Sequence, residues 1–193
     1  MKVYRYVITS DRGSAPNYDE PAATLAICKP KIRLLAQPGD LIIAFTGASI
    51  SSEPHAGCWA GIVSEKLTFE QYWDDARFEK KKPEHCQTPD NIYKPVAGIL
   101  TQVPNSSHQD KHIQRDLSGE FVLVINPVWR FGASGPILPA EFGLRITGGR
   151  RAHRVREISD ADWGRLSIWL AEQSKIESSP FDDAKAGYSR GCS

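Results

Sequence analysis

The sequence lacks several features that would assign a chain to a common class at once. No apolar run approaches the roughly 20 residues that a membrane-spanning helix needs. The net charge is only +1, so the composition does not indicate a general attraction to polyanions, which needs a basic domain. The common phosphate-loop, dinucleotide-binding, nucleophile-elbow and zinc-protease motifs are also missing. The mechanisms that those motifs define therefore have no support in the sequence.

Cysteine is scarce as well. Its four positions are too few and too irregular for a disulfide framework in a chain of 193 residues. The N-terminal residues enter a strand pattern at once and do not resemble a signal peptide, so we expect a cytoplasmic protein. Four residues could in principle bind zinc, His55, Cys58, His85 and Cys86, but they lack the usual C-x-x-C or paired-histidine spacing. We expect no metal and no cofactor.

The pattern of apolar residues predicts many strands and few, short helices. Strands are expected at 2–9, 41–45, 58–63 and 96–103, and at 120–132 with an interruption at Asn126 and Pro127. Short helices are expected at 31–36 and 68–78, the second capped by Thr68 with Gln71. An amphipathic helix is expected at 160–175. This order favours an α+β fold with a small, curved or barrel-like, mostly antiparallel sheet. We expect one domain, residues 1–177, and a flexible tail, 178–193.

Three residues are candidates for catalysis: Cys28, His108 and His153. Cys28 is followed by the cations Lys29, Lys31 and Arg33, and nearby positive charge favours the nucleophilic thiolate. The alternative is a small core residue beside a solvated basic turn. His108 is a candidate acid or base because Asp110 and Asp116 are close in sequence, and the alternative is an exposed loop histidine.

Aromatic and amide side chains suggest how a base could be held. Trp59 and other aromatics could form a slot for a flat ring, although core packing is the alternative for them. Asp90 and Asn91 could read a base edge through paired donors and acceptors, or could simply form a turn.

Positive charge is concentrated in residues 145–156, which contain five arginines and His153 but no acidic side chain. Gly148 and Gly149 would let backbone amides approach an anion, and arginine forks suit phosphate. The stretch therefore indicates a local anion site, and its alternative is a solvated basic hairpin.

Several segments taken together resemble the nucleotide modification associated domain 2 family. They are APN at 15–17, TLAICKPKIR at 24–33, GDLI at 39–42, TFEQYWDDARF with KKP at 68–83, DNIY at 90–93, a Ser-His-Asp loop at 107–110 and a Gly-Arg-His element at 149–153. The resemblance runs from about residue 1 to about residue 156. It implies a domain of bacteria and their phages, linked to systems that make or recognise hypermodified DNA bases. The order of strands is also similar to PUA-like barrels, several of which hold a flipped base.

The resemblance and the residues lead to three hypotheses. The first is a binding module for a modified nucleotide or flipped base; its candidate contacts are Asn17, Lys29, Arg33, Trp59, Asp90, Asn91, Tyr93, Arg150, Arg151, His153 and Arg154. The second is an enzyme acting on a nucleotide or modified base, with Cys28 as nucleophile or with His108 and His153 moving protons. The third is a protein adaptor that uses loops 49–57 and 79–95. The expected partner is a nucleic acid or nucleotide, without a membrane.

Overall fold

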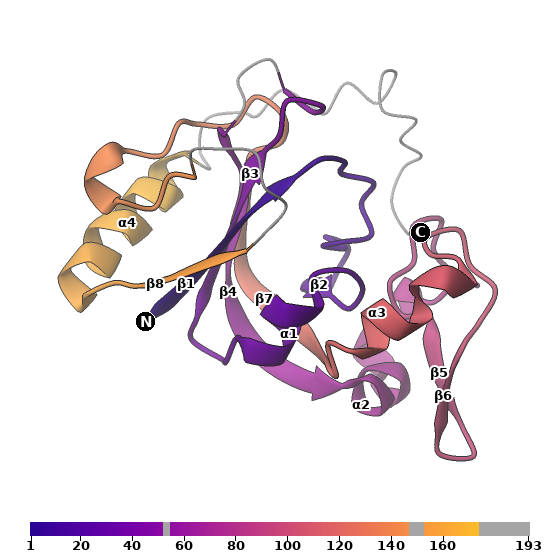
Figure 1. The fold of residues 1–193 in the computed structure, drawn as a ribbon. Coiled ribbons are helices and arrows are strands. Elements are labelled where there is room, and N and C mark those ends of the chain that lie inside the picture. The colour runs from indigo at the N-terminus through magenta and orange to yellow at the C-terminus, as the bar shows by residue number, and fades with distance from the viewer. Residues whose placement is uncertain (52–54, 147–152, 174–193) are drawn as a thin grey trace. The chain divides into compact units, whose positions relative to one another are not determined.

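The computed structural model describes residues 1–51, 55–146 and 153–173, and it shows a mixed α+β fold (Figure 1). One sheet has the strand order β2-β7-β4-β3-β1-β8. Its strands are β1 (Lys2–Ile8), β2 (Ala23–Leu25), β3 (Leu41–Thr46), β4 (Gly57–Thr68), β7 (Phe121–Arg130) and β8 (Arg154–Glu157). Strands β5 (Tyr93–Val96) and β6 (Ile99–Gln102) form a separate hairpin. The β1–β3 pair is parallel, whereas β1–β8, β2–β7 and β3–β4 are antiparallel.

The helices are short, with one exception. The α-helices are α1 (Pro30–Leu35), α2 (Phe69–Asp74), α3 (Ile113–Leu117) and the longer α4 (Asp160–Gln173), and the 3-10 helices are Ala76–Lys81, Asp110–His112 and Ala140–Phe142. Among the residues described, no helix has both the length and the apolar character that crossing a membrane requires.

The α+β class and the mostly antiparallel sheet are confirmed, but the barrel-like closure is wrong. The described sheet is open and ends in two short strands, β2 with three residues and β8 with four. Closure requires staggered pairing all the way around the sheet, for which such short edge strands are poorly suited. The PUA-like likeness stays a prediction.

Two local expectations differ from the structure. The segment predicted as one strand at 96–103 is divided between β5 and β6, because Ala97 and Gly98 have positive φ and reverse the chain. The predicted interruption at Asn126 and Pro127 is absent, and β7 runs through both residues. Both are exposed, and a strand tolerates proline at a position that donates no ladder bond.

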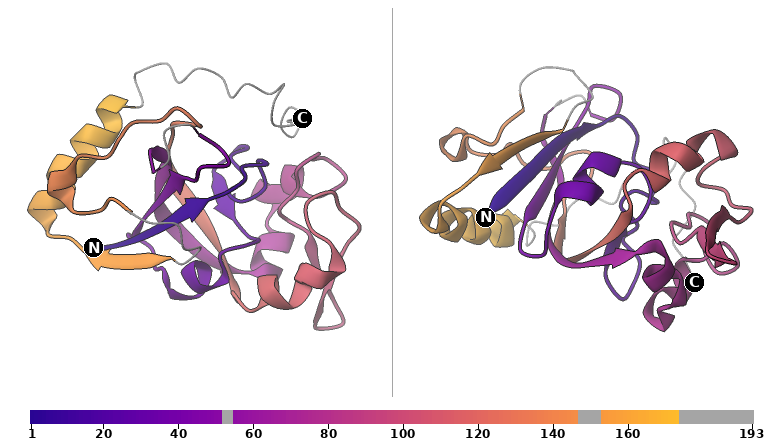
Figure 2. Two further views of the ribbon diagram at one scale, coloured as in Figure 1. Left: turned by 45° about the horizontal axis from the view of Figure 1, so that its top comes forward. Right: turned by 60° about the horizontal axis from the view of Figure 1, so that its bottom comes forward.

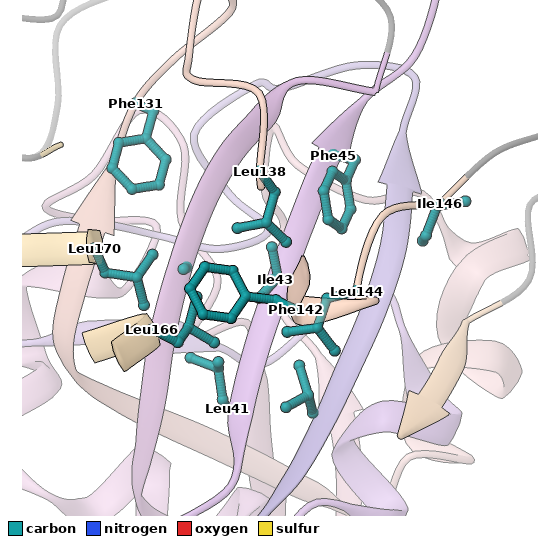
Figure 3. Packing of buried hydrophobic residues seen from close by; sticks show 12 residues of the cluster. Leu41, Ile43, Phe45, Phe131, Leu138, Phe142, Leu144, Ile146, Leu166 and Leu170 are labelled. Carbon is teal, nitrogen blue, oxygen red and sulfur yellow. The ribbon is translucent and has the colours of Figure 1, made fainter. Parts of the chain in front are cut away.

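The chain divides into two compact units, which are described separately. The first unit comprises the described residues of 1–11, 39–63 and 127–183. In it, β8 lies beside β1, as both views of Figure 2 show. Strand β3 is buried at all six positions, as its continuous apolar run predicts. Side chains of β3 pack with Phe142, Leu166 and Leu170, so α4 contributes two residues to this core (Figure 3).

The second unit comprises residues 12–38 and 64–126. Its core contains Ile27, Phe69, Phe78 and Val124, among others. The capping box predicted at Thr68 and Gln71 is confirmed: the Thr68 hydroxyl accepts the Gln71 N–H, and the Gln71 side chain accepts the Thr68 N–H. The tail predicted at 178–193 lies outside the described residues.

The first unit offers a matched pair of glycine substitutions. A Cβ on Gly135 would lie 1.8 Å from the carbonyl oxygen of Gly57, whereas a Cβ on Gly164 in α4 would meet nothing within 4 Å. We expect Gly135→Ala to lower the free energy of unfolding by about 1–3 kcal/mol through overpacking. Gly164→Ala should raise it by up to about 1 kcal/mol, because alanine favours the helix. Urea denaturation of both variants checks this, and an unchanged Gly135→Ala midpoint would contradict the close contact.

Candidate active site

Cys28 occupies a constrained turn in the second unit, between β2 and α1. Cys28 and Lys29 have φ angles of 60° and 43°, the left-handed region that residues other than glycine rarely adopt. Such a conformation costs about 1–3 kcal/mol per residue and persists only where surrounding contacts fix it. Here the Cys28 N–H donates to Asp116 Oδ1 at 3.1 Å, and the Cys28 carbonyl accepts from Arg33 Nε at 2.8 Å. The turn therefore holds Cys28 by its backbone and leaves the thiol half-buried.

The thiol belongs to a cluster of three side chains. Cys28 Sγ lies 3.4 Å from His108 Nε2, and His108 Nδ1 is hydrogen-bonded to Asp116 Oδ2 on the other side of the ring. The order thiol, imidazole and carboxylate is that of a nucleophile, a general base and the group that orients the base. The sequence suggested Cys28 and His108 as alternatives, and the structure brings them together.

Asp116 is the fully buried member of this cluster. Its carboxylate also accepts the Tyr93 hydroxyl at 3.0 Å and lies 3.5 Å from Arg115 Nη2. Tyr93 in turn accepts a hydrogen bond from Gln102 Nε2 at 3.1 Å. The Asp116 carboxylate is thus fixed from several directions, so it can hold the His108 ring in one orientation.

The pKa values of the cluster follow from burial and from these contacts. Burial opposes charging of His108, but the contacts with Asp116 and Cys28 outweigh it and raise the pKa of His108 to about 9. Burial also works against the Asp116 carboxylate, but its hydrogen bond with His108 lowers the pKa of Asp116 below its ordinary value. His108 is therefore protonated at neutral pH, with the Asp116 carboxylate as its counter-charge.

Arg33 supports the turn and is not available to a ligand. Its side chain is fully buried and donates to the carbonyls of Cys28, Phe121 at 2.6 Å and Asp116. Burial, partly offset by Asp116, lowers the pKa of Arg33 to about 10. Gly119 makes room for this guanidinium, since a Cβ there would lie 2.5 Å from it. Arg33 was predicted as a nucleotide contact, and the structure places it beneath the Cys28 turn.

Open space and positive charge lie next to the cluster. An open pocket of about 640 Å³ is lined by His108, Asn105, Gln109, Lys111 and others. The half-exposed Arg115 has Nη2 4.0 Å from Cys28 Sγ, so a positive charge lies close to the thiol. Sequence reasoning missed Arg115; its only signal was adjacency to Asp116.

The predicted base-reading residues form a second polar network in the interior. Asn17, Asp90 and Asn91 are at most 1% exposed. Asp90 accepts the hydroxyls of Thr24 and Tyr72, each at 2.7 Å. Burial raises the pKa of Asp90 to about 6, although the nearby Lys81 opposes the rise.

The remaining polar groups of this network also bond internally. Lys81 Nζ donates to Thr24 Oγ1 at 2.9 Å and to Asn17 Oδ1 at 3.1 Å, and Asn91 Nδ2 donates to the Tyr72 carbonyl at 3.1 Å. Because these contacts tie segments of the second unit together, they support a structural role for Asn17, Asp90 and Asn91.

Other predicted contacts are dispersed. Trp59 is fully buried in the first unit, edge-on to Tyr6 at a ring-centroid distance of 6.2 Å. Lys29 and His153 are half-buried and Arg154 is exposed, whereas Arg150 and Arg151 lie outside the described residues.

The structure groups a different set of possible metal ligands from the one that the sequence suggests. Within the described ranges, the group able to bring three ligand atoms together is Cys28, His108 and Asp116, with those atoms within 4.8 Å of one another. His55, Cys58, His85 and Cys86 do not form such a group among the described residues. The hydrogen-bonded order of the new set fits a catalytic arrangement, and thiol, imidazole and carboxylate are also zinc ligands.

The chain belongs to the nucleotide modification associated domain 2 family, whose model matches residues 1–186. A comparison with curated proteins finds no match, and a comparison with solved structures finds none either. The family description links the chain to nucleotide modification. It says nothing of the Cys28–His108–Asp116 cluster.

The raised pKa of His108 predicts a pH-dependent contribution to stability. Because its folded pKa lies above the ordinary value of 6.5, the contribution is complete below about pH 6.5 and is lost as pH rises through about 9. The gap in unfolding free energy between the wild type and His108→Gln should therefore shrink by about 3 kcal/mol across this window. Urea denaturation at several pH values measures it. His112→Gln should show no such decline, and a constant His108→Gln gap would contradict the ion pair.

Proposed function

We propose that the chain is a thiol-dependent enzyme acting on a nucleotide or modified base, with Cys28 as its nucleophile. The observation that carries the proposal is the 3.4 Å approach of Cys28 Sγ to His108 Nε2, with the buried Asp116 bonded to Nδ1 of the same ring. A half-buried thiol aligned in this way differs from Cys58, whose pKa burial raises to about 12.

The geometry supports an addition–elimination at an electrophilic carbon. The proton of the Cys28–His108 pair is on His108 Nε2, as the raised pKa of His108 favours, and the sulfur of Cys28 forms a bond to that carbon. The leaving group then departs with the proton from His108, so a thioester-like intermediate remains. His108, which is now neutral, deprotonates a water molecule that attacks the same carbon; the second product departs from the sulfur, and His108 keeps the proton, which restores the starting state. Asp116 orients the ring throughout.

Arg115 and the pocket support a nucleotide-sized, anionic substrate. The pocket of about 640 Å³ beside His108 falls in the range of small-molecule sites. Lys111 lines it, and Arg115 lies near the thiol, so positive charge is available for a phosphate or for a developing oxyanion. The family membership supports a nucleotide as the substrate class.

A binding module for a modified base is the second candidate function. The same pocket beside His108 favours it, but in that role no covalent reaction at Cys28 takes place. It differs from the enzyme in one respect: binding does not require the thiol. A protein adaptor gains no specific support from the described residues.

The test has two steps, a reactivity measurement and a substrate screen. Iodoacetamide should alkylate Cys28 selectively, as measured by peptide mass spectrometry, and His108→Ala should slow this reaction at least about tenfold at neutral pH, since general-base contributions are of order 10²–10⁴. His112→Ala is the matched control, because its ring lies 4.7 Å from that of His108 but it makes no described bond to Cys28. It should leave the alkylation rate nearly unchanged.

The screen would incubate the wild type and Cys28→Ala with nucleotides carrying acyl- or amide-substituted bases, followed by intact-mass detection of a covalent adduct. An adduct on wild type that is absent from Cys28→Ala supports the enzyme. Equal binding by both proteins without an adduct would favour the binding module, and zinc retained by wild type but lost by Cys28→Ala would favour a metal centre.

A further inference from the structure

Three arginines gather on one face of the β1–β8 pair in the first unit. The register places Arg5 opposite Arg154 and Val3 opposite Arg156. Because side chains alternate along a strand, Arg154 and Arg156 point to the face that carries Val3 and Arg5. Strand β8 is the edge of the described sheet (Figure 2). All four of its residues are exposed.

Arg5 is the buried member of this arginine cluster. Its residue is 8% exposed, and Nη1 donates to the carbonyls of Leu144 at 2.9 Å and Gly143 at 3.4 Å. Its Nε is fully buried and has no hydrogen-bond partner among the described residues. Arg156 Nη1 donates to the same Gly143 carbonyl at 2.8 Å. Two guanidinium groups therefore converge on one backbone oxygen.

The cluster lacks compensating negative charge in the described part of the chain. No carboxylate there forms an ion pair with Arg5, Arg154 or Arg156. The acidic neighbour Glu157 lies opposite Lys2 in the strand register. By strand alternation, its side chain belongs to the opposite face of the sheet. Burial, together with repulsion from Arg156 and Arg154, lowers the pKa of Arg5. Like charges held this close are stabilised by a bound anion.

We infer that Arg5, Arg154 and Arg156 form a binding site for the oxyanion of a phosphate group. Two exposed guanidinium groups at the sheet edge offer several N–H donors in planar forks, which match phosphate oxygens better than a point charge does. The buried Arg5 holds positive charge beneath them and is anchored by backbone carbonyls. The ligand is either a free nucleotide or the backbone of a nucleic acid, since both present the same phosphate oxygens. The inference does not depend on the thiol chemistry proposed above.

The test is isothermal titration calorimetry of the full chain at constant ionic strength. The probes are inorganic phosphate, thymidine monophosphate and a short single-stranded oligodeoxynucleotide. We expect Arg154→Gln and Arg156→Gln each to weaken binding about tenfold, because each removes charge-assisted hydrogen bonds, and the double variant to abolish it. Arg165→Gln is the control: it removes the same charge from α4, where Arg165 is paired with Asp162. It should bind as the wild type does.

The outcomes separate the phosphate sources and the two proposals. Comparable affinity for monophosphate and oligonucleotide indicates a nucleotide site, and much tighter oligonucleotide binding indicates a backbone site. Binding that survives the double variant, or no binding of any probe, overturns the inference. Thermal unfolding midpoints, measured in chloride buffer, show whether the variants are folded. We expect that Arg154→Gln does not lower this midpoint. Cys28→Ala should bind phosphate normally, so failure of the thiol mechanism leaves this test intact.

Discussion

The candidate active site depends on one buried carboxylate. Asp116 accepts the Cys28 N–H, the Tyr93 hydroxyl and the His108 ring, and its own backbone carbonyl accepts a hydrogen bond from Arg33. A buried charge without such partners would be expelled from the interior or neutralised. The partners come from separate segments of the second unit, so satisfying this charge also positions the thiol, the imidazole and the turn that carries them.

The turn at Cys28 shows how the site is held by backbone contacts. Left-handed φ angles at two successive residues are unfavourable for an L-amino acid, and they persist here because Asp116 fixes the N–H and Arg33 fixes the carbonyl of Cys28. The strain places the half-buried Sγ beside His108. Arg33 therefore acts through the backbone, which explains why so large a charged side chain is fully buried in this unit.

Patterns within a few residues of the sequence predicted several local features correctly. They did not predict which residues far apart in the sequence lie together in the fold. The buried run of β3 and the Thr68 capping box followed from composition and spacing within a few residues. Cys28 and His108 were each recognisable by type, but 80 residues separate them, and no periodicity encodes that distance. Asp90 and Asn91 are adjacent in the sequence, but their role could not be predicted from it. A polar pair in a loop looks the same in sequence whether it faces a ligand or forms hydrogen bonds inside the protein.

The described residues of the second unit form two buried polar networks. They differ in how far they are closed off from solvent, and this difference supports a catalytic role for only one of them. The Lys81–Asp90 network is closed: Lys81, Thr24 and Asp90 are at most 1% exposed, and their described bonds run to one another and to nearby backbone. The Asp116 network is open at one end, since His108 lines a pocket and Arg115 is half-exposed. A closed network stabilises a fold, whereas a nucleophile and its base must also meet a substrate. Within this unit, the Asp116 network combines a fixed, buried carboxylate with His108, which lines a pocket, and with the half-buried Cys28.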